Sequence, residues 1–233
     1  MISYLFWSLQ IINYITFMIL DVCERYAGMS SRIKYASIIL CFLYVILGKK
    51  RERSVYIVAG LFFTVVSDYF LLLTDSFAAG MLSFCVVQTI YSIYCSKDRR
   101  QFVIKEGIQL CIVVGILLGL FVRSPIGLDI VLILSIYYFV HLVSNVLGSW
   151  VRSKEGKERK LFAIGMTLFL LCDIHVAIFN AGDYLSFGSS KVYQTIYAIA
   201  TVAMWFYYLP SQVLIAHAGR NASKVIAKTD NKW

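Results

Sequence analysis

Long apolar stretches follow one another along almost the whole chain, and they restrict the folds that it can adopt. Eight can be drawn, separated by short polar segments: about 2–20, 33–47, 55–73, 77–95, 103–122, 126–150, 161–180 and 192–217. A helix of about 20 apolar residues spans a bilayer. Only 15% of the residues are charged, which is low for a soluble domain. The sequence therefore predicts an all-α fold, a polytopic membrane protein with eight transmembrane helices. We expect one transmembrane domain, residues 1–217, and a basic cytoplasmic tail, residues 218–233.

The basic residues are distributed unevenly between the two sides of these stretches. Seventeen of the 22 Lys and Arg residues follow the second, fourth, sixth and eighth stretches, and the other five, Lys34 among them, fall on the opposite side. Cytoplasmic loops carry an excess of Lys and Arg. We therefore expect a multi-pass protein of the cell membrane with both termini in the cytoplasm. Orientation in the bilayer also explains the net charge of +9, so nucleic acid is not an expected partner. The sequence leaves the oligomeric state open.

Two aspartates, Asp68 and Asp173, lie deep inside apolar stretches, and each follows a glycine by eight residues. An ionised carboxylate at the centre of a membrane helix costs about 2.5–3.5 kcal/mol on insertion scales, so a functional role outweighs a structural one. We expect the third and seventh helices to bring both carboxylates together in the outer half of the membrane.

Each of these two helices is followed by a helix that contains Gln-Thr-Ile-Tyr, at residues 88–91 and 194–197. This repetition is consistent with a four-plus-four internal duplication, in which a pseudo-twofold axis along the membrane normal would pair the two aspartate-bearing helices. Four matching residues in so biased a composition also arise by chance, so both interpretations stay open.

Further polar residues recur at helical spacing within the stretches. They include Gln88 and Tyr91 in the fourth, Tyr137, His141 and Asn145 in the sixth, and Gln194, Tyr197, Thr201, Trp205, Tyr208 and Gln212 in the eighth. Polar faces in lipid turn toward other helices or a wet cavity, which suggests a polar pocket around the two carboxylates. Such side chains also join helices, at about 0.6 kcal/mol each. For Asn145 we favour that structural role, and for His141 both interpretations stay open.

Cofactor and metal motifs are not visible. The six cysteines form no C-x-x-C pair, and the chain lacks H-E-x-x-H, a P-loop and G-x-G-x-x-G. We expect no cofactor, no disulfide framework and no metal site.

Three segments carry a resemblance to a known family. The first runs from Gly60 through Ser67-Asp68 to Phe84 and Tyr91, the second is Gly165-x-x-Leu168-Phe169 to Asp173, and the third is residues 208–216, Tyr-Leu-Pro-Ser-Gln-Val-Leu-Ile-Ala. Together they resemble the YhhN-like family of eight-helix membrane proteins, which includes the lysoplasmalogenases. Where many members carry His, this chain has Gln88, and Cys172 stands where a Ser usually precedes the second aspartate.

The resemblance implies hydrolysis of the vinyl-ether bond of a membrane lysophospholipid, a lysoplasmalogen, to a fatty aldehyde and a glycerophospho head group. Asp68 and Asp173 are then the acid–base pair, in an order that the sequence leaves open. Gln88, Tyr91, His141, Tyr208 and Gln212 are the corresponding substrate-binding candidates, and they would orient the substrate or water. Gln88 cannot transfer a proton as His does, but it can hold a water molecule.

Two other functions remain open from the sequence. The paired acids would also suit a small membrane transporter or a lipid-binding protein that carries a proton or binds a cation. A purely structural membrane protein would use the same polar groups only to hold its helices together.

Overall fold

A computed structural model of the chain describes residues 2–23, 26–123, 129–183 and 191–222. Within these ranges the chain is helical and has no strands. The long helices are α1 (Ile2–Val22), α2 (Ala27–Ile46), α3 (Val55–Leu73), α4 (Phe77–Cys95), α5 (Arg99–Arg123), α6 (Ile130–Arg152), α7 (Lys157–Asn180) and α8 (Lys191–Arg220). Short 3-10 turns, η1 (Ser153–Glu155) and η2 (Ala181–Asp183), follow α6 and α7. All eight long helices are long and apolar enough to cross a membrane, which confirms the predicted fold class.

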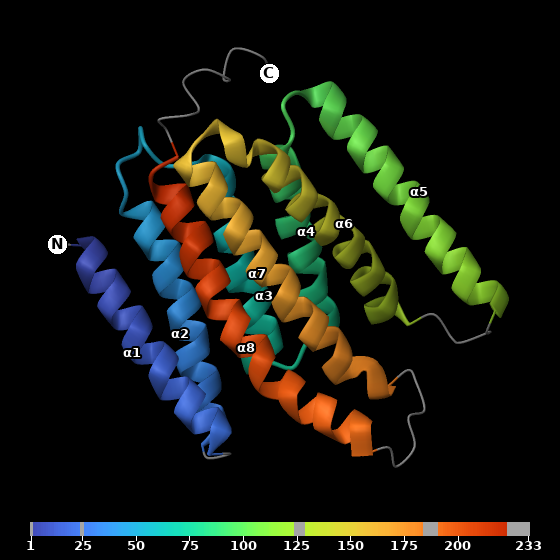
Figure 1. Ribbon diagram of the computed structural model, residues 1–233, viewed down its shortest axis with the longest axis horizontal. Coiled ribbons are helices and arrows are strands. Elements are labelled where there is room, and N and C mark those ends of the chain that lie inside the picture. The colour runs from blue at the N-terminus through green and yellow to red at the C-terminus, as the bar shows by residue number, and fades with distance from the viewer. Residues whose placement is uncertain (1, 24–25, 124–128, 184–190, 223–233) are drawn as a thin grey trace.

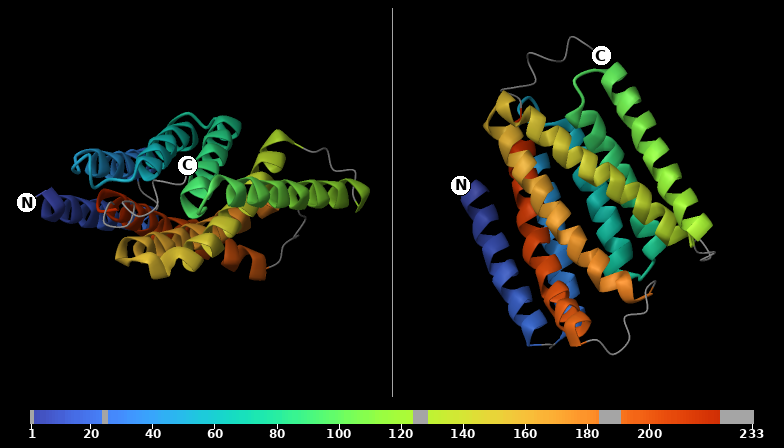
Figure 2. Two further views of the ribbon diagram at one scale, coloured as in Figure 1. Left: turned by 90° about the horizontal axis from the view of Figure 1, so that it is seen from above. Right: turned by 45° about the vertical axis from the view of Figure 1, so that its right-hand side comes forward.

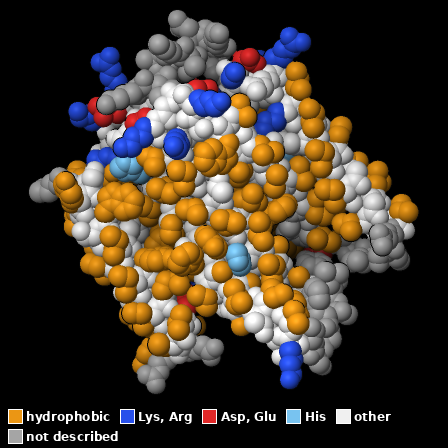
Figure 3. Space-filling view, viewed as in Figure 1, with side chains coloured by type: hydrophobic (Ala, Val, Ile, Leu, Met, Phe, Trp, Pro, Cys, Tyr) orange, Lys and Arg blue, Asp and Glu red, His pale blue; other side chains and the backbone are white. Residues whose placement is uncertain are grey.

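The helices form one bundle in which α7 pairs most extensively with α8, and α3 with α4 (Figure 1). The junctions α2–α3, α4–α5 and α6–α7 lie at the same end of the bundle as the end of α8 (Figure 1). On one face of the molecule, hydrophobic side chains cover the middle while Lys and Arg gather at this end (Figure 3). Most of the expected tail, residues 223–233, lies outside the described residues.

Helix α5 stands at the edge of the bundle, where it contacts α6 and, to a smaller extent, α4 (Figure 2). Its apolar side chains are exposed over much of its length, as expected for a helix that faces lipid. Helix α5 therefore covers α4 and α6 only in part.

Two buried arginines hold the end of α4. Arg152 donates to the carbonyl oxygens of Tyr94 and Ser96 at 2.9 and 2.8 Å, and Arg159 donates to that of Tyr94 at 2.8 Å. The last carbonyls of a helix have no partner within it, so these cations satisfy groups that hydrocarbon would leave unpaired. Glu155 balances the charge of Arg152, with Oε2 of Glu155 2.8 Å from a guanidinium nitrogen of Arg152.

Pro210 lies inside α8, and the helix continues through it. Proline has no N–H, so the carbonyl four residues earlier loses its helical partner. That carbonyl belongs to Phe206, and it accepts a hydrogen bond from the Tyr14 hydroxyl of α1 at 3.2 Å. The proline thus creates a contact between the first and last helices.

Lys34, which the sequence places with the outer polar segments, is buried inside α2. Its Nζ lies 2.8 Å from Asp21 of α1, which also accepts from Ser30 at 2.5 Å, and 4.2 Å from the ring centre of Trp205 in α8. Helix α2 begins at Ala27, six residues earlier than the apolar pattern indicates, so Lys34 lies within its first half, toward the end opposite the basic end of the bundle (Figure 1). This ion pair joins α1 to the rest of the bundle.

The repeated Gln-Thr-Ile-Tyr segments lie in different surroundings. Gln88 is fully buried in α4, whereas Gln194 is exposed near the start of α8. The polar face expected along α8 points inward only in its second half, because Tyr197 and Thr201 are also exposed. The two Gln-Thr-Ile-Tyr segments therefore do not form equivalent parts of one site.

Candidate functional site

Asp68 lies in the centre of the bundle on α3 and is only 3% exposed. The hydroxyl of Tyr208, on α8, donates to its two carboxylate oxygens at 2.9 and 2.7 Å. The neighbouring Ser67 donates to the carbonyl of Gly80 on α4 at 2.6 Å. Asp68 is thus fixed from two sides, by a side chain of α8 and by the attachment of its own helix to α4.

Asp173, the second aspartate, lies on α7 and is half-buried. Its Oδ2 accepts a hydrogen bond from the hydroxyl of Tyr138 on α6. Cys172, the residue before it, is 4% exposed and belongs to the bundle core. Each carboxylate is therefore bound by a tyrosine from another helix.

The two aspartate–tyrosine pairs meet in the middle of the bundle. The carboxylates of Asp68 and Asp173 are close enough to interact electrostatically. The ring of Phe169 lies between the two tyrosines, with centroids 6.5 Å from Tyr138 and 5.6 Å from Tyr208. Four helices thus contribute to one site with two acids and two phenols.

Three fully buried side chains of the bundle core have polar atoms without a hydrogen-bond partner among the described residues. These atoms are Nε2 of Gln88, the hydroxyl of Tyr91 and Oε1 of Gln212. Buried polar groups in proteins are satisfied by protein or by ordered water. The three groups are therefore well suited to hold water or a polar part of a ligand.

The register of α3 against α8 places Gln212 one helical turn from the Asp68 carboxylate. Tyr208 contacts Asp68, and a Cβ on Gly219 would lie 2.4 Å from Ile57, so the two helices run antiparallel in fixed register. Gln212 follows Tyr208 by four residues, which is one turn on the same face. Its unpartnered oxygen thus lies on the side of the site nearer the end of α8.

Asn145 orients the Gln88 amide. Its Nδ2 donates to the backbone oxygen of Gln88 at 2.8 Å and to Oε1 at 3.0 Å. This contact fixes Oε1 as the acceptor and leaves Nε2 free to donate, close to Tyr138. The structural role favoured for Asn145 agrees with this geometry.

Tyr91 owes its position to a glycine. A Cβ on Gly60 would lie 2.3 Å from Cε1 of the Tyr91 ring, so only glycine leaves room for it. The other side of the ring meets Phe162 of α7 edge-on at 5.3 Å.

His141 belongs to a different cluster from the two aspartates. Its Nε2 lies 3.1 Å from Glu106 of α5, and its Nδ1 lies 2.8 Å from the carbonyl of Tyr137. Glu106 also accepts from Ser92 of α4 at 2.7 Å. The structure thus brings together Asp68, Asp173, Gln88, Tyr208 and Gln212. Tyr91 lies about one helical turn beyond Gln88 on α4, and His141 lies nearer to α5.

Sequence reasoning missed Tyr138, Lys105 and Glu106. It selected Tyr137 because of its four-residue spacing from His141, but the buried face of α6 includes Tyr138, His141, Leu142 and Asn145. The alternating spacings of three and one between these residues were the available signal. Lys105 was counted only among the basic residues that follow the fourth stretch, and Glu106 was not considered; both lie within α5, which begins at Arg99, four residues before the apolar pattern does.

The described residues contain no group of three or more His, Cys, Asp or Glu side chains that could hold a metal ion. All six cysteines are free thiols.

The sequence matches the YhhN family over residues 29–219. The matched region begins within α2 and runs almost to the end of α8, so it contains both aspartates and both tyrosines. Neither a curated protein nor a solved structure matches the chain well enough to count as a relative. Because the family match covers most of the chain, this protein is a member of the YhhN family.

Proposed function

We propose that the protein is an intramembrane hydrolase that cleaves the vinyl-ether bond of lysoplasmalogens. The products are a fatty aldehyde and a glycerophospho-ethanolamine or glycerophospho-choline. The observation that carries the proposal is the pair of tyrosine-bound carboxylates inside one transmembrane bundle, on helices α3 and α7, whose tyrosine partners pack on the same ring of Phe169. Membership of the YhhN family supports it.

The chemistry requires one protonated and one ionised carboxyl group. The acid transfers its proton to the β-carbon of the vinyl ether, and an oxocarbenium ion forms at the carbon bound to oxygen. Water adds to that carbon and gives its proton to the carboxylate partner. The resulting hemiacetal passes its hydroxyl proton to the ether oxygen as the C–O bond breaks, which releases the aldehyde and the alcohol. Two carboxyl groups in different surroundings divide these roles in glycosidases in a similar way.

The hydrogen bonds suggest which aspartate has which role. Both oxygens of Asp68 accept from the Tyr208 hydroxyl, and an acceptor-only group is the ionised form of a carboxyl. On Asp173 the Tyr138 hydroxyl binds Oδ2 only, and we place the proton on Oδ1. We assign Asp173 as the acid and Asp68 as the carboxylate that stabilises the cation and receives the proton of water.

The hydrolytic water would be held by the three unpartnered groups. Nε2 of Gln88 and the Tyr91 hydroxyl can donate to a water oxygen, and Oε1 of Gln212 can accept one of its protons. Orienting water in this way requires no proton transfer by residue 88, so glutamine suits the position. The proposed mechanism needs no cofactor and no metal.

The charge distribution supports a proposal for the location. The basic end of the bundle would face the cytoplasm, with both termini there, and the protein would lie in the cell membrane. Asp68 is near the opposite end of α3, so the carboxylates would lie in the outer half of the bilayer.

The test is aldehyde release by the purified protein in detergent from a lysoplasmalogen, with the matching ester lysophospholipid as control substrate. The wild type should release aldehyde from the vinyl ether only. Replacing Asp173 or Asp68 by Asn should lower turnover by about 10²–10⁴-fold, the usual effect of losing a general acid or base.

Two results would contradict the proposal. Near-full turnover by both Asn variants would remove the aspartates from the mechanism. No aldehyde from well-folded wild type would instead favour a transporter or lipid-binding protein, which proton-coupled uptake into liposomes would identify.

A further inference from the structure

We propose that the groove between α4 and α6, on the side toward α5, docks a single-chain lysophospholipid. Its phosphate would bind Lys105, its free glycerol hydroxyl would bind Glu106, and its chain would lie on the apolar wall. This inference rests on the proposed function, since the occupant is the substrate class named there.

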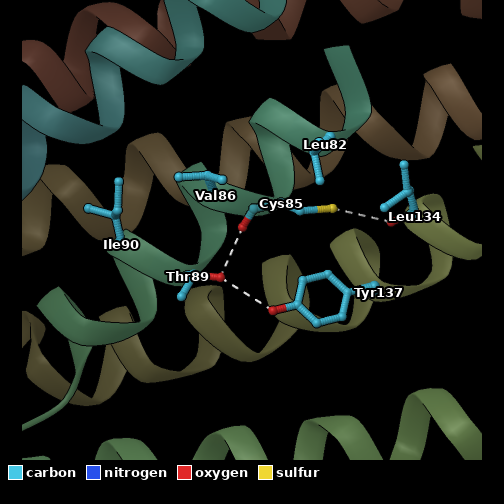
Figure 4. Close-up of a pocket in the computed structure, with 7 residues that line it drawn as sticks. All are labelled: Leu82, Cys85, Val86, Thr89, Ile90, Leu134 and Tyr137. Carbon is cyan, nitrogen blue, oxygen red and sulfur yellow. Dashed lines mark hydrogen bonds between the residues drawn. The ribbon is translucent and has the colours of Figure 1, made fainter. Parts of the chain in front are cut away.

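The groove has a volume of about 390 Å³ and an apolar wall (Figure 4). Leu82, Val86 and Ile90 of α4 line one side, and Leu134 of α6 lines the other. These positions fall along one face of each helix, so the wall extends along the bundle axis rather than into it. Because α5 covers α4 and α6 only in part, lipid can reach this wall from the bilayer.

A pair of hydroxyl groups borders the apolar wall, and a charged cluster lies one helical turn further along α6. Thr89 and Tyr137 lie at the border and share a hydrogen bond of 3.3 Å (Figure 4). The Tyr137 ring stacks on His141, with centroids 4.0 Å apart. His141 in turn lies 3.1 Å from Glu106 on α5. A carboxylate therefore stands directly beyond the end of the apolar wall.

Lys105 of α5 supplies a cation beside Asn145, which is one helical turn beyond His141 on α6. Its Nζ donates to Oδ1 of Asn145 at 2.6 Å, and a Cβ on Gly148 would lie 3.7 Å from it. An ammonium group has three donors, and this is the one hydrogen bond found for it among the described residues. Two donors thus remain for an anionic oxygen, such as that of a phosphate.

The order of these groups matches the order of groups in a lysophospholipid. Tyr137, His141 and Asn145 follow at four-residue intervals on α6, and each interval rises about 6 Å along a helix. Apolar wall, carboxylate and ammonium therefore succeed one another over about 12 Å. In a lysophospholipid the hydrocarbon chain, the glycerol hydroxyl and the phosphate follow in the same order.

Glu106 would make the groove selective for lipids with one chain. Its oxygens accept from Ser92 and lie near His141, and each carboxylate oxygen has a second lone pair. A free hydroxyl on the second glycerol carbon can donate to it. In a diacyl lipid an ester replaces that hydroxyl, and its acceptor oxygens would face the carboxylate without a proton between them.

The groove is a docking site and not the place of the chemistry. Tyr137 lines the groove, whereas its neighbour Tyr138 binds Asp173 inside the bundle. There Tyr138 also packs against Phe84 of α4, with ring centroids 5.6 Å apart.

The test is the binding of an ester lysophospholipid, which has no vinyl ether, to the full-length protein in nanodiscs, measured by native mass spectrometry. Val86→Trp, which fills the groove, and Lys105→Met, which removes the cation, should each weaken binding about tenfold or more. Leu118→Trp places the same large ring on the exposed face of α5, where Leu118 is 58% exposed, and should leave binding unchanged. Methylation of the free glycerol hydroxyl should weaken binding to the wild type, and Glu106→Gln should reduce that difference.

A second measurement does not depend on substitutions. A lysophospholipid with a photoreactive diazirine in its chain should label peptides from α4 and α6 in the wild-type protein. Equal binding by all variants, labelling confined to other helices, or equal competition by a diacyl phospholipid would overturn the proposal. Failure of the proposed function is recognised separately, because it concerns aldehyde release and not the binding of the ester lipid.

Discussion

Removal of the Tyr208 hydroxyl tests the hydrogen bond to Asp68 with the smallest change in structure. Tyr208→Phe keeps the ring and its edge-on contact with Phe169, and it removes the one described donor to both oxygens of Asp68. A hydrogen bond to a charged group contributes about 1.5–3 kcal/mol. If the bond stabilises the ionised Asp68 that the reaction needs, the loss corresponds to a decrease in turnover of about 10- to 150-fold.

The assay is the initial rate of aldehyde release at saturating lysoplasmalogen, with the melting temperature measured on the same preparations. Tyr207→Phe is the matched control, because Tyr207 adjoins Tyr208 on α8 and stacks on His175, which follows Asp173 by two residues and so faces nearly the opposite way on α7. The control should retain wild-type turnover. Equal turnover in Tyr208→Phe and wild type would refute the role assigned to this hydrogen bond, and equal losses in the two variants would show a general effect on α8.

Two further predictions concern stability. Gly60→Ala should lower the melting temperature, because its Cβ would lie 2.3 Å from the Tyr91 ring, whereas Gly115→Ala on α5 meets open space and should be neutral or stabilising; a lower melting temperature for Gly115→Ala alone would contradict this reasoning. Lys34→Met should lower the melting temperature because it leaves Asp21 without its cation, and adding Asp21→Asn should restore part of the loss. No recovery in the double variant would mean that Lys34 acts through its contact with the Trp205 ring instead.

The helices were predictable where the apolar pattern and the helix agree. The bounds of α3 and α4 match the sequence prediction, because polar residues, such as the capping Ser54, directly flank their apolar runs. Helix α5 extends beyond its apolar run, and its first residues carry charges at the basic end of the bundle. Polar side chains there can reach water or one another, so hydropathy alone does not mark the start of such a helix.

The two carboxylates could be singled out from the sequence, but their partners could not. Asp68 and its donor Tyr208 are 140 residues apart, and the pairing depends on which helices become neighbours. Adjacent side chains on a helix point about 100° apart around its axis. Whether Tyr137 or Tyr138 faces Asp173 therefore depends on how α6 is rotated about its axis. Periodicity restricts this rotation, but only packing against α7 determines it.

The most direct test of the mechanism is to run the hydrolysis in D₂O and locate the deuterium in the product. The aldehyde is reduced as it forms and analysed by mass spectrometry. Protonation of the β-carbon by a carboxylic acid predicts one deuterium on the carbon next to the carbonyl, formed by wild type and at a strongly reduced rate by Asp173→Asn. Aldehyde without deuterium at that carbon, or labelled aldehyde formed by Asp173→Asn at the wild-type rate, would contradict catalysis by the aspartate pair.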